Sequence, residues 1–169
     1  MITVLYVDSD LKMCPIISHI FENYESISVF PATSGEEALT WLDRSHADVI
    51  VSEFDLPGMN GIELLLALRS REILLPFIFF SESDSAQVRN EAYLGDVFGF
   101  ITRKGTERKS IINLLRLIMW AAGYNETEYL FSHALQKEDM DRPGTIQRSP
   151  HSPITQAFSI PGSTRDLSQ

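Results

Sequence analysis

The chain has 169 residues, a formal net charge of −9 and 44% hydrophobic residues, which suits one domain of ordinary size with an appendage. The acidic balance argues against a nucleic-acid partner, which would need a basic surface, and against docking on an anionic membrane. No stretch approaches the roughly 20 apolar residues of a membrane span, and the N-terminus lacks a signal-peptide pattern. The single cysteine, Cys14, cannot form an internal disulfide. We therefore expect a cytoplasmic protein.

Short apolar runs alternate with amphipathic segments through most of the chain. The apolar runs predict strands at Ile2–Val7, Ile27–Ala32, Asp48–Glu53, Phe77–Phe80 and Val97–Thr102. Helical spacing predicts helices at Leu11–Tyr24, Ser34–Asp43, Gly61–Ser70, Asp84–Leu94 and Thr106–Ala122. Ser34 is the expected N-cap of the second helix, and Pro15 requires the first helix to start late or to kink.

Strands that alternate with helices predict an α/β fold, a five-stranded parallel, doubly wound sheet with helices on both faces. In such sheets the functional site lies beyond the carboxyl ends of the strands, where the strand order reverses. This rule selects Asp8, Glu53, Ser81 and the adjacent pair Arg103 and Lys104. The four histidines show no metal-ligand spacing.

The domain is expected to occupy residues 1–122, followed by a further helix at 123–138 and a disordered tail at 139–169, where Pro, Ser, Gly, Gln and Thr dominate. The helix predicted at Thr106–Ala122 is apolar nearly all round, whereas a helix covering a sheet needs one apolar stripe. The surplus is expected to pack on the 123–138 helix or on a partner subunit.

Several strand ends and loops carry motifs in a fixed order. They are Val7-Asp8-Ser9-Asp10 after the first strand, Glu53-Phe54-Asp55-Leu56-Pro57-Gly58-Met59-Asn60-Gly61 after the third, Phe80-Ser81 at the fourth and Arg103-Lys104-Gly105 after the fifth. Over about residues 2–121 the chain resembles the receiver domain of two-component response regulators, which implies the flavodoxin-like receiver fold.

The resemblance also implies a phosphorylation site. In that family an acidic pair and an aspartate hold Mg²⁺, the aspartate accepts a phosphoryl group, and a hydroxyl and a lysine bind its oxygens. Here Asp8 matches the first acid and Glu53 the phosphoacceptor, Asp55 matches the residue whose carbonyl ligates the metal, and Ser81 matches the hydroxyl.

Several matches leave alternatives open. Ser9 stands where the second acid is usual, so Asp10 either substitutes as a metal ligand or caps the next helix, and Mg²⁺ binding is expected to be weak or absent. Ser81 binds phosphate or caps a helix. Spacing places Arg103 at the family's lysine, but residue type favours Lys104, and alternation along a strand allows only one to face the site.

Phe100 falls where the family has an aromatic that rotates with the switch, although a plain core role fits equally well. Glu53 is the main departure, because its extra methylene moves the carboxylate by about 1.5 Å. We expect it either to hold an active-like state or to leave the domain unswitched.

The expected function is therefore that of a stand-alone, atypical receiver module in phosphorelay signalling. It would not be an enzyme, and it would act through contacts with a histidine kinase or another signalling protein. Receivers commonly dimerise through the fourth helix, fifth strand and fifth helix, so a homodimer is expected there. The alternatives are a phosphorylation-competent relay that uses Glu53 or Asp55 and a small flavodoxin-like enzyme.

Overall fold

The computed structural model describes residues 1–21, 26–104, 108–123 and 147–148. Its strands are β1 (Ile2–Val7), β2 (Ile27–Ala32), β3 (Val49–Ser52), β4 (Phe77–Ser81), β5 (Gly99–Thr102) and β6 (Gln147–Arg148). Its helices are α1 (Met13–Phe21), α2 (Gly35–Leu42), α3 (Gly61–Ser70), α4 (Ala86–Leu94) and α5 (Arg108–Ala121).

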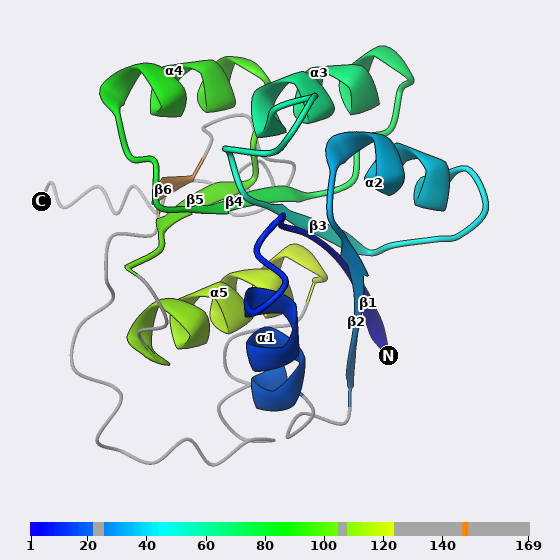
Figure 1. Ribbon diagram of the computed structural model, residues 1–169, viewed down its shortest axis with the longest axis vertical. Coiled ribbons are helices and arrows are strands. Elements are labelled where there is room, and N and C mark those ends of the chain that lie inside the picture. Colours follow the sequence, from blue (N-terminus) through cyan, green and yellow to red (C-terminus); the bar gives the residue numbers. More distant parts are fainter. Residues whose placement is uncertain (22–25, 105–107, 124–146, 149–169) are drawn as a thin grey trace, which may run out of the picture.

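The strands form one sheet in the order β2-β1-β3-β4-β5-β6, and β1 to β5 are parallel. Helices α2, α3 and α4 cover one face and α1 and α5 cover the other (Figure 1). The predicted doubly wound sheet is therefore confirmed. The chain order reverses between β1 and β3, which places the carboxyl ends of the central strands around one rim.

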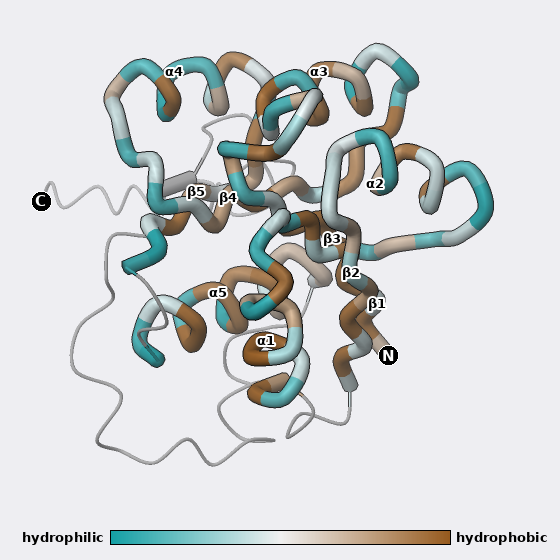
Figure 2. Tube along the Cα trace, viewed as in Figure 1, coloured by the Kyte–Doolittle hydropathy of each residue, from teal (hydrophilic) through white to brown (hydrophobic). Residues whose placement is uncertain are grey.

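Two hydrophobic cores fill the space between the sheet and its helices. One lies between the sheet and the α1–α5 pair, and the other lies under α2, α3 and α4. Figure 2 shows the hydrophobic strands enclosed between helices that carry hydrophilic segments. The central strands β3 and β4 are buried along their whole length, as expected for a sheet covered on both faces.

Several predicted boundaries shift for local reasons. Helix α1 begins at Met13, after a turn in which the Met13 N–H donates to the Asp10 carbonyl at 3.0 Å, so Pro15 falls in the first turn. Ser34 caps α2, as predicted, and accepts a hydrogen bond from the Glu37 N–H. Ser85 caps α4, so that helix begins two residues after Asp84.

The apolar surplus of the last helix is largely buried. Seven of its apolar residues are buried, namely Ile111, Ile112, Leu114, Leu115, Leu117, Ile118 and Met119. Trp120 remains 37% exposed. The predicted 123–138 helix lies outside the described residues apart from Gly123, so its packing against α5 stays a prediction.

The short strand β6 is a feature that the sequence did not predict. Gln147 and Arg148 pair antiparallel with Phe100 and Gly99 of β5. Both lie in the segment 139–169, and the disorder expected for that segment stays a prediction. The rest of the segment lies outside the described residues.

Candidate functional site

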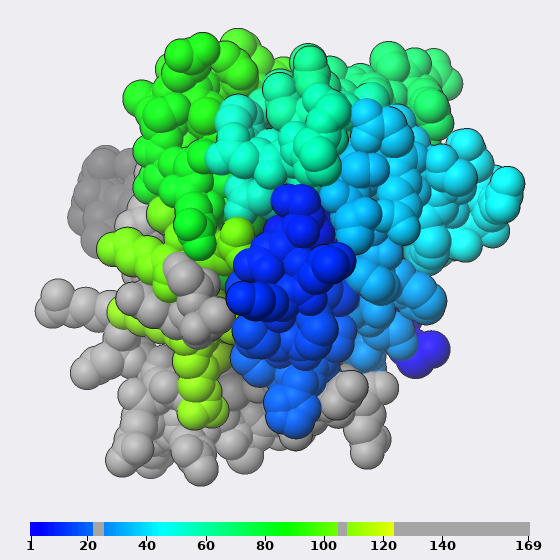
Figure 3. Space-filling model, in the orientation of Figure 1, coloured from blue at the N-terminus to red at the C-terminus, as the bar shows by residue number. Residues whose placement is uncertain are grey.

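Four polar side chains converge where the central strands end. Asp8 follows β1, Glu53 follows β3, Ser81 ends β4 and Arg103 follows β5. All four are at most 7% exposed. Figure 3 views the molecule from the side on which the dark-blue segment that leads into α1 lies beside the turquoise segment that leads into α3.

The Glu53 carboxylate is held by donors on both oxygens. Its Oε1 accepts hydrogen bonds from the Phe54 N–H at 2.7 Å, the Asp55 N–H at 3.4 Å and the Ser81 hydroxyl. Its Oε2 accepts a charge-assisted hydrogen bond from Nη2 of Arg103 at 2.8 Å. Hydrogen bonds from a hydroxyl, two backbone amides and a guanidinium therefore already surround this group.

Arg103 bridges the two buried acids. Besides Glu53, it reaches Asp8 through Nη1, at 3.4 Å from Oδ2. Burial lowers the pKa of Arg103, but the negative charges of Asp8 and Glu53 raise it by more, so the pKa lies above its ordinary value. The guanidinium is therefore a permanent buried cation.

This arrangement corrects the preference for Lys104. Lys104 is exposed, whereas Arg103 continues the β4–β5 pairing by donating its N–H to the Ser81 carbonyl at 2.7 Å. Because successive side chains of an extended strand point to opposite sides, only Arg103 turns toward the carboxylates. Sequence spacing from Ser81 indicated the correct residue, and residue type did not.

Asp8 is fixed by a partner that the sequence analysis missed. The Tyr6 hydroxyl donates to Oδ2 of Asp8 at 2.9 Å, and the Asp10 N–H donates to Oδ1 at 2.8 Å. Burial, followed by the charge of Asp8, raises the pKa of Tyr6, which keeps this hydroxyl protonated. Tyr6 lies two residues before Asp8 in a strand, so period-two alternation would have placed both on one side.

The carboxylates of Asp10 and Asp55 have partners outside the buried group. Asp10 is exposed and its carboxylate accepts the Lys12 N–H at 3.0 Å, so it acts as a cap of the turn before α1. Asp55 is also exposed, and its carboxylate accepts a hydrogen bond from the Ser83 hydroxyl. Of the two roles left open for Asp10, the structure shows the cap.

Phe100 is fully buried beneath α4. Its ring packs against Phe79, with centroids 5.6 Å apart, and the Arg89 guanidinium lies 4.5 Å from its centroid. Arg89 in turn bonds to Asp84 and, at 2.9 Å, to the Thr102 hydroxyl. No motif or spacing in the sequence indicates this polar link between α4 and β5.

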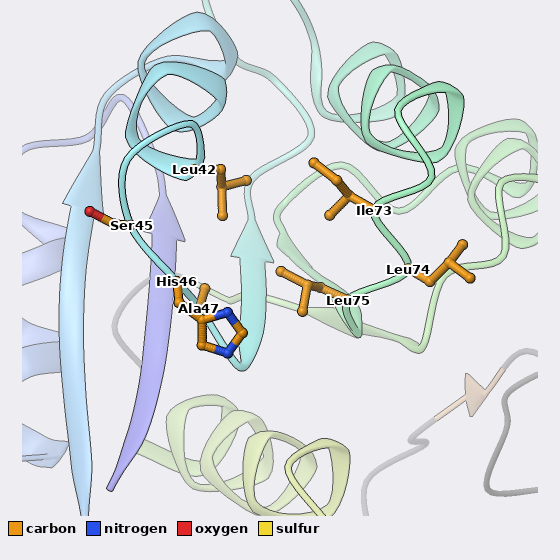
Figure 4. Close-up of a pocket in the computed structure, with 7 residues that line it drawn as sticks. All are labelled: Leu42, Ser45, His46, Ala47, Ile73, Leu74 and Leu75. Atoms are coloured by element: carbon orange, nitrogen blue, oxygen red, sulfur yellow. The ribbon is translucent and has the colours of Figure 1, made fainter.

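A pocket of about 280 Å³ lies at the opposite end of the strands. It is lined by Leu42, Ser45, His46, Ala47, Ile73, Leu74 and Leu75 (Figure 4). Leu42 ends α2, and the other residues belong to the loops that enter β3 and β4. None of the buried acids contributes to it, so it is separate from the polar site.

The comparisons with known proteins identify the family. The profile of the response regulator receiver domain matches residues 4–116. The chain belongs to the response regulator receiver domain family. This receiver domain therefore serves two-component signalling.

Three relatives illustrate the match. The transcriptional activator protein ExaE of Pseudomonas putida is 28% identical over 73% of this chain and 58% of its own length. A protein-glutamate methylesterase/protein-glutamine glutaminase of Clostridium acetobutylicum is 34% identical over 60% of this chain and 30% of its own length. The solved receiver domain of the Francisella response regulator 1452 is 30% identical, with a TM-score of 0.61, over 71% of this chain and 98% of that domain.

The chain thus spans about three fifths or less of the curated relatives that it matches. Their shared part is the receiver domain, and their further activities belong to those longer proteins. None of the helices in the described part of the chain combines the length and the apolar character that a bilayer crossing demands.

The residues of this receiver domain do not fit Mg²⁺, the metal that receiver domains typically bind at their acidic pocket. A magnesium site needs oxygen ligands that are free to face the ion. Here both oxygens of Asp8 and both oxygens of Glu53 already accept hydrogen bonds or pair with Arg103. Across the described ranges, no three His, Cys, Asp or Glu side chains are grouped to hold a metal.

Proposed function

We propose that this chain is an atypical receiver in which the Glu53 carboxylate takes the place of a phosphoryl group. It would then signal through protein–protein contacts, with a histidine kinase or another signalling protein as partner. This signalling would not require phosphorylation of the chain. The observation that carries this proposal is the set of donors that converge on Glu53.

A phosphoryl group on a shorter aspartate would need a hydroxyl, backbone amides and a cation around its oxygens. Glu53 already engages one of each kind, namely Ser81, the Phe54 N–H and Arg103. Its additional methylene carries the carboxylate about 1.5 Å farther from the backbone, toward these donors. The negative charge of the Glu53 carboxylate therefore lies where a transferred phosphoryl group would place its negative charge.

The same geometry disfavours phosphoryl transfer to Glu53. An incoming phosphoryl donor would have to displace Ser81 and Arg103 from the carboxylate, and an angstrom of misplacement costs on the order of 10²-fold in rate. Asp55, the other acid of this loop, is exposed and bonds to Ser83. A phosphorylation-competent relay thus has less support than a permanent mimic, and membership of the family favours signalling over a small flavodoxin-like enzyme.

Incubation with acetyl phosphate and Mg²⁺, followed by intact mass measurement, tests the proposal. We expect no phosphoryl adduct on the parent chain, because Glu53 is engaged. Peptide mapping that finds stoichiometric phosphate at Glu53 or Asp55 would overturn the proposal.

A substitution tests the mimicry separately. Glu53→Gln keeps the size of the side chain and removes its charge, so Arg103 loses one partner and the link to Ser81 weakens. We expect the amide NMR signals of β4, β5 and the start of α4 to shift. The matched control Glu63→Gln, at an exposed glutamate of the α3 capping box, should leave those signals in place.

A further inference from the structure

The charge balance of the buried site is unusual for a place expected to hold a divalent ion. Two carboxylates, Asp8 and Glu53, are each 5% exposed and lie around one guanidinium. The residue after Asp8 is Ser9, an exposed neutral side chain, so a third negative charge is missing there. The buried side chains therefore sum to about one negative charge, which leaves little electrostatic demand for a second cation.

The position of Arg103 explains how this balance is reached. Its two terminal nitrogens pair with different acids. Nη1 lies 3.4 Å from Asp8, and Nη2 lies 2.8 Å from Glu53. A planar guanidinium suits this bridging because its donors diverge in a fixed fork. Its buried Nε makes no hydrogen bond among the described residues, and Oε1 of Glu82 lies 3.9 Å from it. The two terminal nitrogens are thus engaged by the buried carboxylates, and the contact with the exposed Glu82 is the longest of the three ion pairs.

Mg²⁺ would compete poorly for these carboxylates. The ion requires a near-octahedral shell of oxygens and keeps several waters, whereas Asp8 already accepts bonds from Tyr6 and the Asp10 N–H. A divalent ion beside Arg103 would also face cation–cation repulsion inside a poorly solvated site. Both effects oppose metal entry while the guanidinium stays in place.

We propose that Arg103 is the built-in cation of this receiver and replaces Mg²⁺. It would position Glu53 against Ser81 and make the conformation of the site independent of divalent metal. This inference deepens the proposed function and rests on it, because a phosphoryl mimic that needs no donor would also need no metal to stabilise it.

Thermal unfolding of the full chain in millimolar MgCl₂, against NaCl at matched ionic strength, tests the inference. A ligand that binds only the folded state raises the melting temperature. We expect no Mg²⁺-specific shift for the parent chain. Arg103→Gln should melt lower, because it leaves two buried acids unpaired, and should regain a rise of a few degrees with Mg²⁺.

The matched control is Arg71→Gln, which removes an exposed arginine paired with Asp43 at 3.4 Å. It should melt close to the parent and ignore Mg²⁺. If Arg103→Gln does not fold, the double variant Ser9→Asp with Arg103→Lys supplies a third acid and a smaller cation. Electron paramagnetic resonance would detect bound Mn²⁺. We expect Mn²⁺ to bind this variant saturably and not to bind the parent.

Saturable binding of Mg²⁺ or Mn²⁺ by the parent chain would overturn the inference, and so would a folded Arg103→Gln protein that ignores Mg²⁺. These outcomes differ from failure of the proposed function, which appears as a phosphoryl adduct in the mass measurement. A parent chain that binds no metal and yet accepts phosphate would refute the mimicry alone.

Discussion

The position of the Glu53 carboxylate depends on the close approach of a glycine. Gly61 begins α3 and donates its N–H to the Phe54 carbonyl at 2.8 Å, which ties the helix to the segment that carries Glu53. A Cβ added at Gly61 would lie 2.5 Å from the Glu53 carbonyl oxygen and 2.7 Å from Cε1 of Phe79. Only a residue without a side chain fits there, so the helix and the site are packed as one unit.

Gly61→Ala should therefore disturb the site as well as the fold. Overpacking against backbone atoms costs about 1–3 kcal/mol, which urea unfolding would measure as a loss of free energy of unfolding. Gly35→Ala is the matched control, because its Cβ would meet the flexible Met59 side chain at 3.1 Å. Equal losses of the free energy of unfolding in the two variants would show that the contact between Gly61 and Glu53 does not add to the destabilisation.

Polar side chains also join two elements near the site, helix α4 and strand β5. Asp84 bonds to Arg89 and, at 2.7 Å, accepts the Thr102 hydroxyl. The Arg89 guanidinium lies over the Phe100 ring, so the bonds that hold Arg89 also cover this buried ring. We infer that they help to hold Phe100 inside the core, whichever of the two roles predicted for it applies.

Asp84→Asn tests this link through its pH dependence. The hydrogen bond from Arg89, with smaller help from Thr102, holds the pKa of Asp84 below its ordinary value of 3.8. A lowered folded-state pKa stabilises the protein above the unfolded-state pKa, and the benefit disappears as pH falls through the folded-state value. Because the side chain is 37% exposed, solvent screening limits the contribution to about 0.5 kcal/mol.

Chemical unfolding of the parent and of Asp84→Asn would measure this contribution. We expect the difference in free energy of unfolding to be present near neutral pH, to shrink below about pH 4 and to decrease in high salt. A difference that is constant with pH would assign the effect to packing and not to charge.

At the scale of the whole molecule, the two residues of β6 occupy the edge of the sheet beside β5. Gln147 and Arg148 of β6 pair with β5, and an edge strand otherwise offers unpaired backbone groups to another chain. The expected homodimer would use α4, β5 and α5, which is the same side of the molecule. We infer that β6 and a second copy compete wherever the dimer needs the β5 edge.

Replacing both Gln147 and Arg148 with proline removes the backbone donors of β6. If the competition holds, sedimentation velocity should show tighter self-association of this variant than of the parent, by about tenfold in Kd, which corresponds to about 1.4 kcal/mol. Gln156→Pro, outside β6, is the control. Monomers throughout, up to high concentration, would argue against the homodimer itself.

Local pattern was enough to predict β1 to β5, α1 to α5 and three of the four buried polar positions. Apolar runs and helical spacing are short-range signals, and in a parallel sheet the carboxyl ends of neighbouring strands must share a rim, so Asp8, Glu53 and Ser81 could be placed together in advance. Contacts between distant segments settled the rest. A one-residue difference reverses the face of a strand residue, and only the pairing of Arg103 with Ser81 fixes which cation is buried. Strand alternation puts Tyr6 and Asp8 on one side, but the pairing of β6 with β5 depends on three-dimensional proximity that no sequence period encodes.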